Sequence, residues 1–283
     1  MSHGYRARGI MDAGGTNEAT GADLTPAPGS QPMSGWYVPP PAEPLKSDED
    51  LRREREAKVE ELRLRGLLRS SRIRTAMLAV RREDFVPRGY RDHVYEEIPL
   101  PLPGEQATIS CPHSYPLFYE ELGLRRGHRF LEVGVGSGYG TALAREIVGP
   151  EGLVVSVELD AVTLAFARGN LERAGYADVV LVHGDGGLGC PGHAPYDRIC
   201  VTAACPEVPP PLLEQLRIGG RLAAPILEDE RQLLTLVRKT ARGVRRTTIC
   251  DVLYVPLRGR YGVGSWSPAP WRNRGGRRRG RAS

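Results

Sequence analysis

The feature that most constrains the fold is an apolar segment that runs directly into a glycine-rich turn. Residues 130–140 read FLEVGVGSGYG, and a second apolar segment, VVSVE, ends at Glu158. Glycine lets backbone N–H groups approach a ligand where a side chain would collide, and an acid that ends the next strand can accept hydrogen bonds from ribose hydroxyls. The pattern predicts a parallel sheet with a nucleoside pocket at one edge.

The spacing of these glycines discriminates between classes of nucleotide ligand. A dinucleotide fingerprint has the form G-x-G-x-x-G. Counted from Gly134 and Gly136 the third position is Tyr139, and counted from Gly136 and Gly138 it is Thr141. An NAD-linked dehydrogenase is therefore disfavoured. The turn has the form G-x-G-x-G, which resembles the S-adenosylmethionine turn of class I methyltransferases.

Apolar and amphipathic segments alternate along most of the chain, which predicts an α/β fold with a doubly wound, mostly parallel, Rossmann-like sheet. The expected strands are 130–133, 153–158, 179–183, 198–202, 221–226, 231–239 and 247–255. The expected helices are 116–122, 140–148, 162–174 and one that ends across 215–218 before a Gly-Gly pair. Helices over 47–66 and 73–82 would form a small N-terminal cap. The proline-rich stretch 95–103 is expected to be extended and outside the main sheet.

Composition divides the chain into three parts. Residues 1–45, rich in Pro, Gly and Ala, predict a disordered extension, residues 46–258 a single domain, and residues 259–283 a flexible basic tail. Six arginines and no acid lie in 271–283, so the tail accounts for the net charge of +5. The domain itself is nearly neutral, so neither a nucleic-acid partner nor an RNA methyltransferase is expected.

Other classes are excluded by what the sequence lacks. It contains no apolar run long enough to span a membrane and no secretory leader pattern, so no membrane partner is expected. The five cysteines are scattered and form no C-x-x-C pair, so we expect neither a disulfide framework nor a metal site. These observations favour a cytoplasmic protein, which we expect to be a monomer.

Five further segments resemble segments of the protein-L-isoaspartate (D-aspartate) O-methyltransferase family, and they occur in the same order along the chain. GEQATISCPHS (104–114) matches the family's Q-x-T-I-S-x-P segment, and HGDGGLGCPGHAPYDRICVTAAC (183–205) its GDG and APYD blocks. AMLAVRREDFVP (76–87), LRIGGRLAAPI (216–226) and VLYVPL (252–257) complete the resemblance, which covers roughly residues 55–258. Cys111 stands where the family often has Gln or Ala, and Tyr115 where some members have His.

The resemblance implies S-adenosylmethionine as the cofactor and a set of site residues. Ser110 matches the active-site serine, and Thr108 would help it to hold the acceptor by hydrogen bonds. The cofactor residues implied are Ala107, Ile109, Glu132, Gly134, Gly136, Gly138, Glu158, Asp185 and Gly186. Glu158 would bind the ribose, and Asp185 with Gly186 would lie on the adenine side.

The implied reaction is methyl transfer to the α-carboxylate of L-isoaspartyl residues, or the β-carboxylate of D-aspartyl residues, in damaged proteins and peptides. A carboxylate with a pKa near ~4 is ionised at neutral pH and needs no general base. The methyl ester would collapse to a succinimide, and hydrolysis of the succinimide would regenerate some normal aspartate. Positioning and the exclusion of water would then supply most of the catalysis.

Simpler interpretations of these residues remain open. Ser110 could be a loop hydroxyl that caps its own backbone, Glu132 could cap the helix after the glycine turn, and Asp185 could be a turn residue. A dedicated enzyme that converts one aspartate of a peptide precursor to an aspartimide is an alternative function. A protein that binds the nucleoside without turnover is another, although it would not need the ATIS segment.

Overall fold

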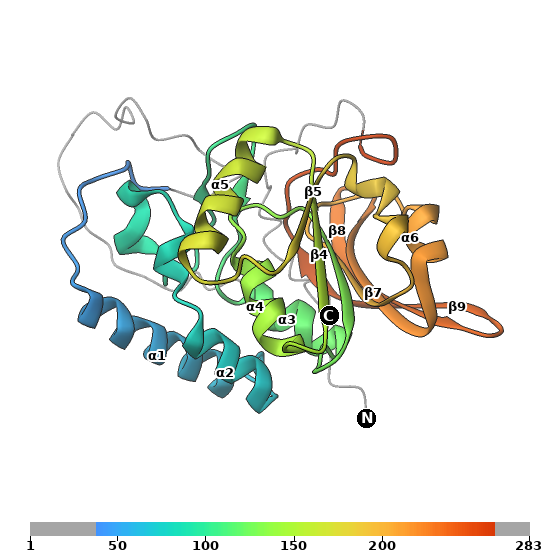
Figure 1. Ribbon diagram of the computed structural model, residues 1–283, viewed down its shortest axis with the longest axis horizontal. Coiled ribbons are helices and arrows are strands. Elements are labelled where there is room, and N and C mark those ends of the chain that lie inside the picture. The colour runs from blue at the N-terminus through green and yellow to red at the C-terminus, as the bar shows by residue number, and fades with distance from the viewer. Residues whose placement is uncertain (1–37, 264–283) are drawn as a thin grey trace, which may run out of the picture.

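A seven-stranded sheet forms the centre of the computed structural model, which describes residues 38–263 (Figure 1). The strand order is β5-β4-β3-β6-β7-β8-β9. The parallel strands are β3 (Arg129–Val133), β4 (Leu153–Glu158), β5 (Val180–His183), β6 (Tyr196–Val201) and β7 (Leu216–Glu228). The antiparallel strands β8 (Arg231–Thr240) and β9 (Gly243–Val252) complete one edge. The chain order therefore reverses at β3, with β4 on one side and β6 on the other, and the doubly wound prediction is confirmed.

The central strands β3, β4 and β6 are buried on both faces, and alternate residues of each strand point to opposite sides. Phe130 of β3 belongs to one apolar cluster and Leu131 to the other. The first cluster also contains residues of α3 (Ser114–Leu122) and α4 (Tyr139–Val148), whereas the second contains Leu212 of α6 (Pro210–Gln215). α5 (Ala161–Arg173) begins at an Asp160 cap and packs on β4 and β5.

Two helices at the N-terminal end of the described chain form the expected cap. α1 (Asp48–Leu64) begins at a capping box in which the Ser47 hydroxyl accepts a hydrogen bond from the backbone N–H of Asp50. α2 (Ser71–Ala79) contacts both α1 and α4. Figure 1 shows these helices at the opposite end of the molecule from the β8–β9 hairpin. Short 3-10 helices, η1 (Arg82–Phe85) and η2 (Arg88–His93), lead from the cap toward the sheet.

The Gly-Gly pair at 219–220 was expected to follow the end of a helix, and this was wrong. α6 ends at Gln215, and β7 begins at Leu216 and runs through both glycines. The pairing of β7 with β6 shifts register between Tyr196 and Arg198, and Gly219 has a φ of +83°. A left-handed residue inside a strand accommodates such a bulge, so the glycines interrupt a strand and do not stop a helix.

A small hairpin and a C-terminal segment cross the edge where the parallel strands end. β1 (Leu100–Pro101) pairs with β2 (Thr108–Ile109) in a separate two-stranded sheet. The proline-rich stretch 95–103 thus lies outside the main sheet as expected, but residues 95–98 form a turn and bends and are not extended. Residues 253–263, which we call the strap, return from β9 and pair with the chain after β6 through Ala204. The packed part of the chain is longer than expected. Val38, which precedes the predicted start of the domain at residue 46, is buried. Arg260, which follows the predicted end at residue 258, donates a backbone hydrogen bond to Asp185. The rest of the predicted extension and tail, residues 1–37 and 264–283, lies outside the described residues.

Candidate active site

The glycine turn between β3 and α4 adopts a conformation that requires its glycines. Gly134, Gly136 and Gly138 have φ angles of +93°, +56° and +87°, which L-residues with side chains rarely adopt. A β-carbon on Gly134 would lie 2.4 Å from the hydroxyl oxygen of Thr202, which follows β6. That hydroxyl donates to the carbonyls of Val133 and Gly134, so the turn is fixed from the neighbouring strand.

Glu158 holds the same turn from the other side. One carboxylate oxygen accepts a hydrogen bond from the backbone N–H of Gly136 at 3.1 Å. The other oxygen accepts from the N–H groups of Leu159 and Asp160 at 3.0 and 3.2 Å. The side chain is partly exposed at the edge of the sheet, so its position is set by backbone donors while it stays accessible to a ligand.

The β1–β2 hairpin covers the glycine turn. A β-carbon on Gly136 would lie 3.5 Å from the carbonyl oxygen of Thr108 and 3.7 Å from Leu102. The loop that joins β1 to β2 packs on the start of α5, where the Thr163 hydroxyl donates to the carbonyl of Pro103 at 2.9 Å. Ile109 is buried, whereas Ala107 and Thr108 are half-buried. The structure therefore brings residues 107–110 and the glycine turn together, although the two segments lie far apart in the sequence.

Ser110 follows the hairpin and lines a small, partly open cavity of about 20 Å³. Glu132, Thr202 and Tyr254 line the same cavity. The position of Ser110 depends on Arg82, a residue that sequence reasoning missed. The Arg82 guanidinium is buried and donates to the carbonyls of Ser110 and Val94 at 2.7 and 2.6 Å. The only signal in the sequence was an arginine inside the otherwise structural segment 76–87.

Glu132 lies beneath α4 and does not cap it. Its carboxylate accepts hydrogen bonds from the hydroxyls of Thr141 and Ser156 at 2.6 and 3.0 Å, and its side chain is buried. Burial raises the pKa of Glu132 to about 7, and the two hydrogen bonds oppose that increase. The residue therefore joins β3, β4 and α4 at the floor of the site, where it lines the cavity beside Ser110.

Asp185 has the turn role that the simpler interpretation assigned to it, and an additional one. Its Oδ1 accepts from the N–H of Gly187 at 2.8 Å, and its Oδ2 accepts from the N–H of Arg260 in the strap at 2.7 Å. Gly186 packs so tightly that a β-carbon would lie 2.4 Å from Val133. Asp185 and Gly186 are thus at the same edge as Glu158, because β5 ends beside β4.

A family model and individual relatives match this chain closely. The model for protein-L-isoaspartate(D-aspartate) O-methyltransferase matches residues 53–262. The protein-L-isoaspartate O-methyltransferase of Methanopyrus kandleri is 46% identical over 219 residues, which cover 77% of this chain and 96% of the relative. That of Hyperthermus butylicus is 44% identical over 229 residues, with 77% and 95% covered.

Solved structures agree with these sequence matches. One protein-L-isoaspartate O-methyltransferase superposes with a TM-score of 0.66 at 36% identity, covering 74% of this chain and 67% of that one. Another structure is that of a putative protein-L-isoaspartate O-methyltransferase from Plasmodium falciparum in complex with S-adenosyl-L-homocysteine. It superposes with a TM-score of 0.65 at 25% identity and covers 72% of this chain and 98% of that one.

The buried carboxyl of Glu132 makes stability depend on pH. Its folded pKa of about 7 lies above the ordinary value of 4.5, so between these values the folded state binds more protons than the unfolded chain. The contribution of Glu132 to stability therefore falls as pH rises through this window and stays low above it. Glu132→Gln cannot show this loss, because glutamine does not titrate. The free energy of unfolding of the variant minus that of the parent should therefore rise by about 3 kcal/mol between pH 4.5 and pH 8.

The measurement is urea unfolding of both proteins at several pH values. Ser71→Ala, which removes no titratable group from an exposed position of α2, serves as the control and should give a difference from the parent that is nearly constant with pH. A constant difference for Glu132→Gln as well would show that the carboxyl does not titrate in this window.

Proposed function

The chain belongs to the protein-L-isoaspartate(D-aspartate) O-methyltransferase family, and we propose that it methylates isoaspartyl residues in damaged proteins and peptides. The acceptors are the α-carboxylate of L-isoaspartyl and the β-carboxylate of D-aspartyl residues, and S-adenosylmethionine is the methyl donor. One observation carries the proposal. The segment that contains Thr108 and Ser110 lies directly over the glycine turn at Gly136, so an acceptor held by the first would meet a nucleoside held by the second.

The residues at the edge of the sheet fit S-adenosylmethionine. The glycines of the turn Gly134–Gly138 have positive φ angles and pack closely on the protein around them, and backbone N–H groups of such turns suit close approach of a ligand. Glu158 would accept from the ribose hydroxyls, and Asp185 with Gly186 would contact the adenine side. Ala107 and Ile109 would close the site from the hairpin. When bound, the cofactor supplies an electrophilic methyl group.

The site holds no obvious general base, and the proposed reaction does not require one. An acceptor carboxylate is ionised at neutral pH. The neighbouring titratable groups are committed elsewhere: Glu132 is buried under α4, and His113 is paired with Glu97 at 2.5 Å. Burial raises the pKa of the Cys111 thiol to about 12. The task of the protein is therefore to position the acceptor and to exclude water.

Ser110 and Thr108 are the residues that would hold the acceptor carboxylate. Both lie on the segment whose position is fixed by β1–β2 pairing and by Arg82. A hydroxyl that donates to a carboxylate orients it without taking part in bond formation, and such charge-assisted hydrogen bonds are among the stronger ones in proteins. The hairpin would at the same time shield the reacting groups from solvent.

The polypeptide acceptor is the partner that this function requires, and we propose that the enzyme acts as a monomer without nucleic acid. All five cysteines lie among the described residues and are free thiols, which supports a reducing compartment such as the cytoplasm. Within residues 38–263, no helix has the length and apolar character needed to cross a membrane. The relatives from Methanopyrus kandleri and Hyperthermus butylicus are both named protein-L-isoaspartate O-methyltransferase. A dedicated enzyme that forms an aspartimide in one peptide precursor is therefore not favoured.

Replacement of Glu158 tests the cofactor site. Glu158→Gln removes the charge while keeping the shape, so S-adenosylhomocysteine should bind about ten- to a hundredfold more weakly, because hydrogen bonds to charged groups are the stronger ones. Isothermal titration calorimetry would measure this, with Glu172→Gln, at an exposed position of α5, as the control that leaves the affinity unchanged. Equal affinities for the parent and Glu158→Gln would show that Glu158 does not bind the cofactor.

Replacement of Ser110 tests the acceptor site. Ser110→Ala should lower kcat/KM for an isoaspartyl peptide at least about tenfold, which corresponds to the loss of one hydrogen bond to a charged group. The affinity for S-adenosylhomocysteine should stay within about twofold of the parent value. Ser71→Ala, at an exposed position of α2, should change neither quantity. A fall in cofactor affinity as large as the fall in activity would contradict the acceptor role.

Methyl transfer to matched peptides tests the function itself. One peptide contains isoaspartate and the other normal aspartate at the same position, with labelled S-adenosylmethionine as donor. We expect label only in the isoaspartyl peptide, as a base-labile ester. Labelling of neither peptide, with cofactor binding confirmed by calorimetry, would overturn the proposal and would indicate a dedicated peptide substrate or a protein that binds the nucleoside without turnover.

A further inference from the structure

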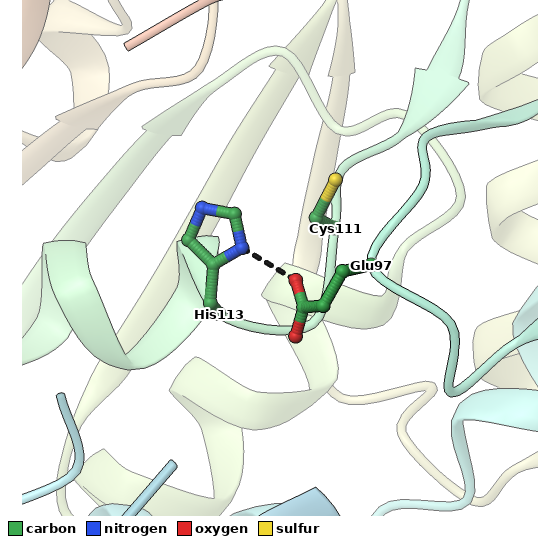
Figure 2. Close-up of side chains that lie close together, drawn as sticks. All are labelled: Glu97, Cys111 and His113. Atoms are coloured by element: carbon green, nitrogen blue, oxygen red, sulfur yellow. Dashed lines mark hydrogen bonds and ion pairs between the residues drawn. The ribbon is translucent and has the colours of Figure 1, made fainter. Parts of the chain in front are cut away.

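Three side chains of different ligand types meet beside the hairpin that carries residues 107–110. Figure 2 shows Glu97, Cys111 and His113, which come from the two loops on either side of the hairpin. One oxygen, the sulfur and one ring nitrogen all lie within 4.8 Å of one another. Within the described residues this is the cluster of acidic, cysteine and histidine side chains whose ligand atoms lie close enough to share one ion.

The cluster is enclosed but not sealed. Cys111 is 7% exposed, whereas the side chains of Glu97 and His113 are 24% and 35% exposed. His113 Nδ1 and a carboxylate oxygen of Glu97 lie 2.5 Å apart and share a hydrogen bond. An ion could therefore enter from the side of Glu97 and His113 and reach the buried sulfur of Cys111.

We propose that Glu97, Cys111 and His113 bind a divalent transition-metal ion of the Zn²⁺ class. A thiolate, an imidazole and a carboxylate suit Zn²⁺ or Co²⁺, whereas Mg²⁺ and Ca²⁺ prefer oxygen ligands alone. Bond lengths of about 2.0–2.3 Å place tetrahedral ligand atoms about 3.3–3.6 Å apart. Binding would have to move the ligand atoms into that range from their present separations, which are 2.5 Å between His113 and Glu97 and at most 4.8 Å within the cluster. The fourth position would be left to solvent.

The charges near the cluster set the conditions for binding. Cys111 must lose its proton to act as a ligand, after which Glu97 and the thiolate balance the two charges of the ion. Lys58 opposes binding, because its Nζ lies 3.4 Å from the second carboxylate oxygen of Glu97. The same Nζ is paired with Glu61 at 2.6 Å, so it keeps a partner if an ion draws Glu97 away.

The position of the cluster gives binding a structural consequence. Cys111 directly follows Ser110, and Glu97 precedes β1 by three residues. An ion bound to both loops would cross-link the two ends of the β1–β2 hairpin. Since a ligand that binds only the folded state stabilises it, the thermal midpoint of unfolding should rise with metal concentration. Metal binding at this cluster does not depend on the proposed methyl transfer.

Titration of the metal-free, full-length protein with Co²⁺ is the direct test, because Co²⁺ substitutes for Zn²⁺ and reports its ligands. We expect one equivalent to bind with a thiolate-to-cobalt charge-transfer band in the near ultraviolet and intense visible bands of four-coordinate cobalt. Added Zn²⁺ should displace it. Cys111→Ser should abolish the charge-transfer band, and His113→Gln should weaken binding at least about tenfold.

Two further variants distinguish this site from non-specific thiol binding. Cys250→Ser removes a half-buried cysteine of β9 outside the cluster and should leave the spectrum unchanged. Lys58→Met should tighten Co²⁺ binding, because it removes the opposing charge next to Glu97. Absence of the charge-transfer band in the parent would overturn the proposal, as would its persistence in Cys111→Ser. If Cys111→Ser fails to give the parent circular dichroism spectrum, unchanged binding in a folded His113→Gln would overturn it instead.

Discussion

The hydrogen bond from the backbone N–H of Gly136 to the carboxylate of Glu158 is the contact on which the site depends. It joins the turn after β3 to the end of β4 and thereby fixes where a nucleoside could lie. The contact exists because the two strands are parallel and in register, with Val133 opposite Val157. Any change that shifted this register would separate the acid from the turn, however well each strand formed on its own.

Cover for this edge comes from segments that precede and follow the strands in sequence. The hairpin that contains Thr108 lies over Gly136, and the strap reaches Asp185 through the N–H of Arg260. Arg258 of the strap also pairs with Glu105 of the hairpin at 3.0 Å, so the two covers contact each other. That pair is largely exposed and contributes little stability. The hairpin and the strap are instead held mainly by their own contacts at the edge of the sheet, which include the Thr163 hydroxyl on Pro103 and the pairing of Ala204 with the strap.

The sequence predicted the sheet, the glycine turn and Glu158 because each depends on local residue order. Apolar segments at βαβ spacing allow few topologies, and three alternate glycines allow few ligands. Arg82 could not be predicted in this way, because its partners, the carbonyls of Val94 and Ser110, are brought to it by tertiary packing. The Gly-Gly pair at 219–220 was misread for a related reason. A glycine with positive φ serves a bulge as well as a helix end, and only the partner strand decides between them.

The turn role of Asp185 is compatible with the contact on the adenine side that the resemblance implies. From the sequence it was either a turn residue or an adenine contact. In the structure its Oδ1 closes the turn at Gly187 while its Oδ2 accepts from the strap. Because a carboxylate oxygen has two lone pairs, Oδ2 can accept a second donor without releasing the first. A nucleoside contact at Asp185 therefore need not displace the strap, and the turn that positions the carboxylate is itself a condition for that contact.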